Sequence, residues 1–414
     1  MPSVEGVGAR KAALGMLDAV LRRGQTLDSA AGSERKLPPA DHALAIAIAG
    51  ETLRRIPDLD ALIDSATRRR LPEDSKARMV LRLGLAQKIG LGTPDHALVA
   101  TALPLVDGGP RRLVHGVLGT LLRRGVPAID APRLPEEVEQ RWRSAWGEEA
   151  VQAARRQIAK RPPLDLTFAN DQETKAFGGI SLAPKHARLE SSGVSDLPGF
   201  VEGKWWVQDL AASLPARLIP TAASQVLDLA AAPGGKTMQL AAAGHHVTAV
   251  DSSGSRLERL RGNLQRTHLN AELVEADALN WEAGHQFDAI LLDAPCSATG
   301  TFRRHPEVLY RARPNIIAGN AELQKEILNR AVRWLRPGGS LVYSVCSLEP
   351  EEGEAVVSTF LQTHGDFTTD PPRAGESPAF VTPLPEGGVR ILPGLLEAEG
   401  GLDGFFMARL VRSA

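Results

Sequence analysis

The sequence predicts a multidomain protein with an all-α N-terminal domain, a small α/β linker module and a C-terminal α/β domain built on a parallel sheet. Apolar residues recur at helical spacing from Ala9 to Arg124, with Pro and Gly between the segments. From Gln225 onward, short β-rich runs alternate with helical ones, which is typical of βαβ units whose helices cover both faces of a parallel sheet. A chain of 414 residues is long enough for about two to four domains.

The helical domain is expected over residues 1–130, where an apolar stripe includes Ala13 and Met16. A proline-bearing stretch then leads to a helical segment and a mixed one, so residues 131–205 are expected to form a linker helix and a small α/β module. Residues 206–414 are expected to form the third domain. Its strands are expected at Val226–Leu229, His246–Asp251, Glu272–Val274, Phe287–Asp293 and Ser340–Val345.

The charge of the chain is unevenly distributed along it. Residues 1–130 contain 19 Lys and Arg against 14 Asp and Glu, a net charge of +5. Because the whole chain has a net charge of −1, the rest of the chain carries −6. The arginines of the helical domain occur in clusters, a pattern compatible with phosphate contacts and equally with solvated helix ends. These clusters are Arg22-Arg23, Arg54-Arg55, Arg68-Arg69-Arg70, Arg111-Arg112 and Arg123-Arg124.

Composition excludes several classes of protein. Neither a signal peptide nor an apolar run of membrane-spanning length occurs, so we expect a soluble, cytoplasmic protein with no membrane partner. Two cysteines in the whole chain cannot form a disulfide framework, and without nearby histidines they make a poor zinc site. We therefore expect no metal, and we expect a monomer.

A glycine-rich turn opens the third domain, between a strand and a helix that starts near Thr237. It lacks the G-x-G-x-x-G of dinucleotide sites, and it misses the phosphate-binding pattern because Ala230 stands at the first glycine position. A tight turn without a ligand is a further alternative. Because glycines let a backbone approach a ligand closely, we expect cofactor contacts here. The candidate residues are Ala230, Ala231, Ala232, Pro233, Gly234, Gly235 and Lys236.

Two acidic residues at later strand ends extend this candidate site. Asp251 ends the second strand, where a carboxylate can accept both hydroxyls of a ribose, which indicates an adenosine-type cofactor. Asp277, after the third strand, is then expected near the adenine amine, although an Asp in such a place is often a helix cap.

The only two cysteines occupy matched positions. Cys296 lies in Asp-Ala-Pro-Cys-Ser and Cys346 in Tyr-Ser-Val-Cys-Ser, each after an apolar, strand-like run. Open α/β sheets bind ligands at the carboxyl ends of their strands, so both thiols are expected there. A single free cysteine is more often a small buried hydrophobe, but two at matched strand ends indicate catalysis.

These segments together resemble the RNA 5-methylcytosine methyltransferases of the Sun/RsmB type. The resemblance rests on Val226–Leu240, on Asp293–Ser297 with the Arg-Arg-His-Pro-Glu that begins at Arg303, and on Leu335–Glu352. Residues 9–125 resemble the RNA-binding NusB family. The chain departs from the family at Ala230, where Cys is frequent, and at Val345, where Thr is frequent; neither change removes a reacting group.

The resemblance implies a Rossmann-like fold, S-adenosyl-L-methionine as cofactor and an RNA substrate, ribosomal RNA first of all. It also implies three roles. Cys346 is the thiolate that attacks C6 of cytosine, and Cys296 assists breakdown of the covalent intermediate. Asp293 contacts the cytosine edge near N3 and borders the cofactor. If the two strands are neighbours, their ends lie about 5 Å apart and both thiols face one base.

Other interpretations remain open at this point. The alternatives are the same chemistry on transfer RNA, a non-catalytic RNA-binding assembly factor and an ATP-binding protein. The intact cysteines disfavour the assembly factor, and Ala230 disfavours the ATP-binding protein. Arg303, Arg304 and His305 are expected on a loop that either binds RNA backbone or is solvated. For Trp205 and Trp206, core packing is favoured over stacking on a base.

Overall fold

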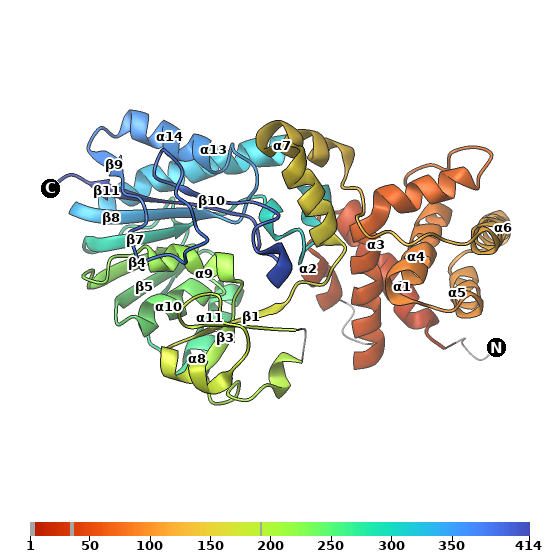
Figure 1. Cartoon of the computed structure of the whole chain (residues 1–414), viewed down its shortest axis with the longest axis horizontal. Helices are drawn as coiled ribbons and strands as arrows, with labels where there is room; N and C mark the ends of the chain where they lie inside the picture. The colour runs from red at the N-terminus through yellow and green to blue at the C-terminus, as the bar shows by residue number, and fades with distance from the viewer. Residues whose placement is uncertain (1–4, 34–36, 191–192) are drawn as a thin grey trace. The chain divides into compact units, whose positions relative to one another are not determined.

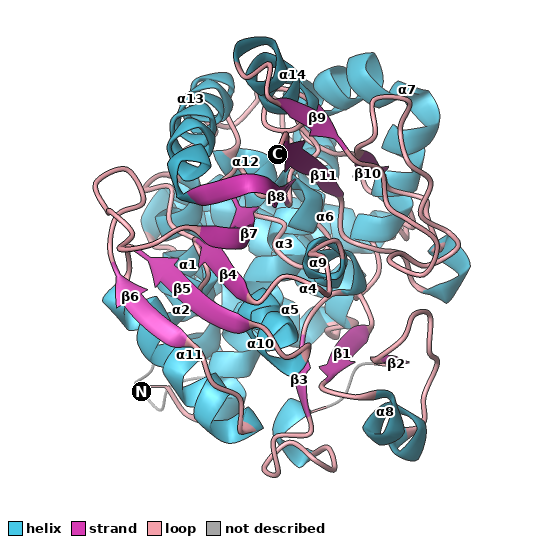
Figure 2. Ribbon diagram, turned by 90° about the vertical axis from the view of Figure 1, so that its left-hand side faces the viewer, coloured by secondary structure: helices cyan, strands magenta, loops and turns pink. Residues whose placement is uncertain are grey.

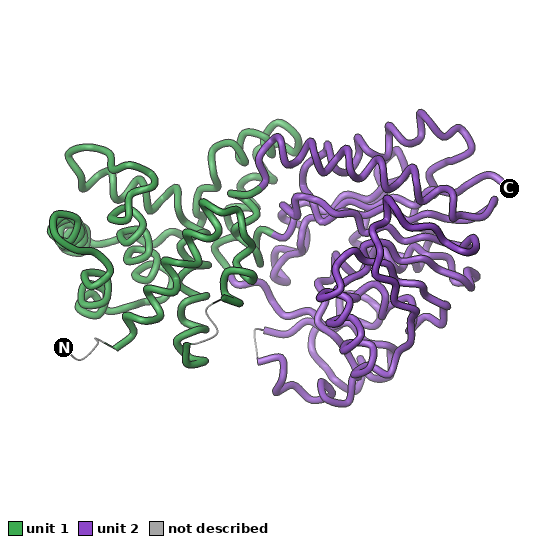
Figure 3. The backbone as a smooth tube through the Cα atoms, turned by 180° about the vertical axis from the view of Figure 1, so that it is seen from behind, with its two compact units in different colours: residues 1–160, 302–311 green, residues 161–301, 312–414 purple. Residues whose placement is uncertain are grey.

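The computed structural model describes residues 5–33, 37–190 and 193–414. The chain forms two compact units, drawn in two colours in Figure 3. The first, here called the helical unit, comprises residues 1–160 and 302–311, and the second, the sheet unit, comprises residues 161–301 and 312–414. The division into domains at 130/131 and 205/206 stays a prediction.

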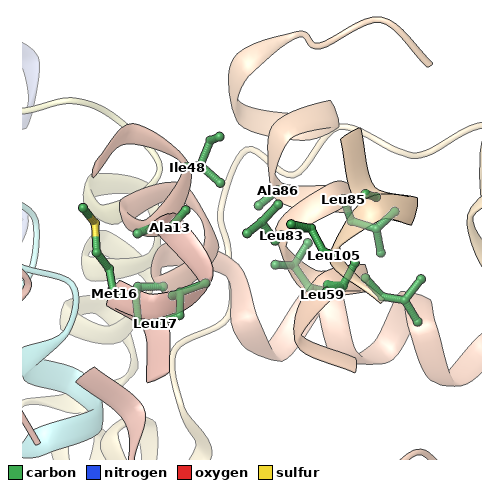
Figure 4. Close-up of a cluster of buried hydrophobic side chains, with 14 of the residues drawn as sticks. Ala13, Met16, Leu17, Ile48, Leu59, Leu83, Leu85, Ala86 and Leu105 are labelled. Atoms are coloured by element: carbon green, nitrogen blue, oxygen red, sulfur yellow. The ribbon is translucent and has the colours of Figure 1, made fainter. Parts of the chain in front are cut away.

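The helical unit confirms the all-α expectation for the N-terminal part of the chain. Its helices are α1 (Val7–Leu21), α2 (Leu27–Gly32), α3 (Pro39–Ser65), α4 (Lys76–Leu91), α5 (Asp95–Ala102), α6 (Gly108–Arg124) and α7 (Glu136–Ile158), labelled in Figure 1, and α12 (Val308–Arg311), labelled in Figure 2. Figure 4 shows the apolar stripe of α1, with Ala13, Met16 and Leu17, in the core that includes Ile48 of α3 and Leu83 of α4. The helical periodicity of the sequence therefore corresponds to one shared core.

A short segment from the C-terminal half of the sequence folds with these helices. The ring of Phe302 lies 5.4 Å from that of Trp142 in α7. Tyr310 donates its O–H to the carbonyl of Leu53 at 2.8 Å, and Glu307 accepts the backbone N–H of Leu27 at 3.1 Å. Residues 302–311 follow the Cys296 loop directly, so that loop continues into the core of the helical unit.

The sheet unit contains an eight-stranded sheet in the order β10-β11-β8-β7-β4-β5-β6, with β9 paired to β11. Figure 2 shows β6, β5, β4, β7 and β8 side by side, and these five are parallel. They are β4 (Gln225–Leu229), β5 (His246–Asp251), β6 (Glu272–Glu275), β7 (Phe287–Asp293) and β8 (Leu335–Val345), which confirms the five expected strands. The sequence did not predict β9 (Phe367–Thr369), β10 (Val389–Ile391) or β11 (Phe405–Arg412), and β11 runs antiparallel to β8.

Helices cover both faces of this sheet, as expected. One face packs against α13 (Pro314–Ala331) and α14 (Glu354–Thr363). The other packs against α9 (Leu210–Arg217), α10 (Gly235–Ala242) and α11 (Gly254–Thr267). With both faces buried, the central strands are continuous apolar runs, which made them easy to find in the sequence.

A separate three-stranded antiparallel sheet precedes α9, in the order β2-β1-β3. Its strands are β1 (Leu164–Phe168), β2 (His186–Leu189) and β3 (Trp205–Val207), and α8 (Asp171–Phe177) connects the first two. Trp205 and Trp206 are 0% and 2% exposed, which confirms core packing for both. Among the residues that the structure describes, no helix is long and apolar enough to cross a membrane.

Candidate active site

The glycine turn joins β4 to α10 and is shaped by its neighbours in the fold. Gly234 has φ +103°, and a Cβ there would lie 2.0 Å from Cδ1 of Leu260 in α11. Only glycine fits such a conformation and such a close approach. Ala231 donates its N–H to the carbonyl of Val250 at 3.1 Å, which holds the turn against the end of β5.

Asp251 is the acidic residue that ends β5, and its buried carboxylate supports the turn. Oδ2 accepts the N–H of Ala232 at 3.1 Å, while Oδ1 accepts the N–H of Ser253 at 2.9 Å and an N–H of Arg256 at 2.8 Å. A carboxylate has about four acceptor positions. One position therefore stays open for a ribose hydroxyl, and a second opens when the half-exposed Arg256 moves aside.

Asp277 occupies a turn rather than a pocket wall. Its exposed carboxylate accepts the N–H of Leu279 at 2.9 Å and the side-chain amide of Asn280 at 3.0 Å. Such local bonds are those of a capping residue, the alternative left open by the sequence. A contact between Asp277 and adenine stays a prediction.

Asp293, at the carboxyl end of β7, is held between a cation and a hydroxyl. Lys236 of the glycine turn donates to its Oδ2 at 2.7 Å, and Ser344 of β8 donates to its Oδ1 at 2.9 Å. The Lys236 ammonium also lies over the ring of Phe405, 5.3 Å from its centre. The candidate cofactor turn and the candidate cytosine contact thus meet in one ion pair.

Asp228 of β4 is a further carboxylate of the site, and it is fully buried. The sequence did not indicate a role for it. Thr237 donates its O–H to Oδ2 at 2.6 Å, and burial raises the pKa of Asp228 to about 7. Within the described part of the chain, Oδ1 has no hydrogen-bond partner. A buried polar atom left unpaired costs free energy, which is typical of a site built for a ligand or a function.

The two cysteines face each other at the ends of neighbouring strands. In the parallel pairing of β7 and β8, Asp293 lies opposite Ser344, and the two Sγ atoms are 3.6 Å apart. Hydrogen bonding to Cys346, followed by burial, raises the pKa of the Cys296 thiol well above its ordinary value. The Cys296 thiol is therefore held in its protonated form beside the Cys346 sulfur.

Glu352 is another group that the sequence did not indicate. Its carboxylate is buried and accepts hydrogen bonds from Ser297, Ser347 and Asn320. Burial raises its pKa. A run of charged residues and glycine, Glu-Pro-Glu-Glu-Gly-Glu, resembles a solvated loop in sequence, so no local signal marked this residue.

In the segment after the Asp-Ala-Pro-Cys motif, Arg303 differs from both expectations. Arg303 is 1% exposed, so the solvated-loop alternative is wrong for it, and it is not available on the surface for RNA backbone. Arg304 and His305 are half-buried in the same segment. Among the described residues there is no cluster of metal-binding side chains.

A glycine turn after β4 and an acidic residue ending β5 are typical of Rossmann-like folds that bind an adenosine cofactor. Together with the antiparallel β11 beside β8, they place the sheet unit in the class of Rossmann-like methyltransferases that use S-adenosylmethionine. The residues around the turn fit that cofactor, because Asp251 keeps an acceptor position open and Asp228 holds an unpaired oxygen. Residues 215–411 match the sequence model of the protein family described as 16S rRNA methyltransferase RsmB/F. Residues 8–123 match the sequence model of the NusB family.

Similar proteins extend over the whole chain. Ribosomal RNA small subunit methyltransferase B of Vibrio cholerae is 34% identical, over 98% of this chain and 97% of its own length. The protein of the same name from Xanthomonas campestris is 35% identical, over 99% of this chain and 98% of its own length. The chain belongs to the ribosomal RNA small subunit methyltransferase B family of S-adenosylmethionine-dependent methyltransferases.

Solved structures show the same architecture. A methyltransferase homolog from Pyrococcus horikoshii is 28% identical, with a TM-score of 0.56 over 71% of this chain and 98% of that one. The protein PH0851 gives a TM-score of 0.74 at 23% identity, over 99% of both chains. At that identity the likeness shows the fold alone.

Proposed function

We propose that this protein methylates C5 of a cytosine in small-subunit ribosomal RNA through a covalent bond between Cys346 and the base. The observation that carries the proposal is the pair of thiols, 3.6 Å apart at the carboxyl ends of β7 and β8 and next to Asp293. The relatives, whose names state methylation of small-subunit ribosomal RNA, support the choice of substrate.

The chemistry requires a nucleophile because C5 of cytosine has no lone pair. In the proposed sequence the Cys346 thiolate bonds to C6, and the displaced electron pair makes C5 able to take a methyl group. S-adenosylmethionine supplies that methyl group. Asp293 accommodates the charge or proton that develops at N3, held in place by Lys236 and Ser344. In the last step a water molecule takes the C5 proton, the electron pair of that C–H bond re-forms the C5–C6 double bond, and the Cys346 sulfur leaves as a thiolate, assisted by the Cys296 thiol 3.6 Å away.

The test is to map 5-methylcytosine in RNA of cells with and without this protein, together with methylation of purified RNA. Loss of one 5-methylcytosine from small-subunit ribosomal RNA is the expected result. Loss of 5-methylcytosine from transfer RNA instead would show that transfer RNA, and not ribosomal RNA, is the substrate. An unchanged map of 5-methylcytosine, with methylation at another atom, would overturn the C5 assignment.

A further inference from the structure

Glu352 joins the two cysteine loops through one buried carboxylate. Ser297, which follows Cys296, donates its N–H to Oε1 at 2.8 Å and its O–H to Oε2 at 2.5 Å. Ser347, which follows Cys346, donates its O–H to the same Oε2. The residue after each thiol is therefore bound to the same side chain.

The carboxylate is saturated by these donors. Asn320 of α13 adds a fourth bond, to Oε1 at 3.0 Å, so four donors meet the roughly four lone-pair positions of a carboxylate. Glu352 is 0% exposed, and its own backbone carbonyl accepts the O–H of Tyr343 in β8 at 2.6 Å. The group is thus anchored to a central strand. If one of its hydrogen-bond partners is lost, no solvent water can replace that partner.

We propose that Glu352 is a positioning residue that sets the separation of Cys296 and Cys346 and so the approach of both thiols to one base. Its meaning for catalysis rests on the proposed function, but the geometry stands without it. A glutamine at this position has the same shape, but its neutral amide loses the charge that strengthens all four bonds. Its NH₂ would face either the N–H of Ser297 and the amide of Asn320, which can only donate, or the hydroxyls of Ser297 and Ser347, which would have to turn and accept. Glu352→Gln should therefore weaken the junction that holds the two loops together.

The first test measures the thiol pair alone, without RNA. A trivalent arsenical binds tightly only when two thiols reach one arsenic atom, and the full-length wild type should bind it with one equivalent per chain. Glu352→Gln should weaken that affinity about tenfold, because the pair is no longer held in place beforehand. Glu351→Gln, at the exposed neighbouring position, is the matched control and should bind as the wild type does.

The second test measures catalysis. Glu352→Gln should lower kcat about 10- to 100-fold, because small displacements of reacting groups are costly. The KM for S-adenosylmethionine should stay unchanged, since no atom of Glu352 belongs to the glycine turn. Glu352→Asp, which keeps the charge with a shorter reach, should recover part of the lost rate.

Each outcome separates the two proposals. Unchanged arsenical affinity and kcat in a folded Glu352→Gln protein would overturn the positioning role. If Glu352→Gln does not fold, Ser297→Ala decides, since it removes one hydroxyl donor and keeps the backbone bond; unchanged affinity in that variant contradicts the role. Weakened affinity in a protein whose wild type methylates no cytosine would leave the positioning role intact and refute the proposed function.

Discussion

At the scale of single residues, the site contains buried carboxylates as well as the two cysteines. Asp228 is fully buried with one satisfied oxygen, and its pKa is raised to about 7 by burial. Its ordinary value is 3.8. Between these two values the folded state keeps a proton that the unfolded state has released, so the free energy of unfolding falls as pH rises from about 4 to about 7.

Asp228→Asn should remove this dependence, because an amide does not titrate. The free energy of unfolding, measured by urea denaturation at about pH 5 and about pH 8, should fall less in the variant than in the wild type. Above about pH 7 the variant should be the more stable of the two. Parallel curves for both proteins would show that Asp228 titrates normally.

Asp251 carries the prediction for the cofactor. Asp251→Asn removes one carboxylate oxygen while leaving the shape, and we expect the affinity for S-adenosylmethionine to fall about 10- to 100-fold, the usual cost of a hydrogen bond to a charged group. Arg256→Ala is the control: it frees the Oδ1 oxygen and should bind at least as tightly as the wild type. Calorimetry that gives equal affinities for Asp251→Asn and wild type, or tighter binding of ATP, contradicts the assignment.

At the scale of elements, the sequence predicted what local patterns encode. Four of the five parallel strands, β4, β5, β7 and β8, are largely buried apolar runs, and each was recognised from its own residues, as was the short edge strand β6. The antiparallel strand β11 is also an apolar run, which the sequence prediction missed, but its place beside β8, about seventy residues earlier, is not encoded in any local pattern. The same limit applies to Glu352, whose burial follows from the approach of the Ser297 and Ser347 loops.

The glycine turn offers a matched pair of substitutions. Gly234→Ala combines a strained φ with a clash against Leu260, whereas Gly244→Ala at φ +93° meets open space. Strain alone should cost about 1–3 kcal/mol in each variant, and the clash should add a further loss at position 234 only. Thermal denaturation measures both. Equal losses in the two variants would mean that α11 yields freely to the turn.

At the scale of the whole molecule, the basic N-terminal region is more structural than its composition suggests. Arg54 and Arg55 are buried and paired with Glu51, so this cluster is neither a phosphate contact nor a solvated helix end. Arg68 and Arg69 are exposed and, among described residues, make no hydrogen bond or ion pair. Because residues 302–311 fold with the helical unit, substitutions in the full chain test RNA binding better than truncation does.

Arg68→Gln and Arg69→Gln together should weaken RNA binding and reduce its salt dependence. Each lost phosphate contact should lower the slope of log affinity against log salt concentration by about 0.7 to 0.9. Arg336→Gln, half-exposed near the amino end of β8, is the control and should change neither. An unchanged slope in the double variant would make these arginines solvated surface only.

The central claim, covalent catalysis by two cysteines in a set order, is tested most directly by the RNA adducts of two variants on a denaturing gel. Cys296→Ala should attack and methylate but fail to release, giving a slower-migrating protein band that requires substrate RNA. Cys346→Ser should give no adduct and negligible methylation, because serine is a much weaker nucleophile at neutral pH. An adduct with Cys346→Ser and none with Cys296→Ala would reverse the roles, and full activity in both variants would contradict covalent catalysis.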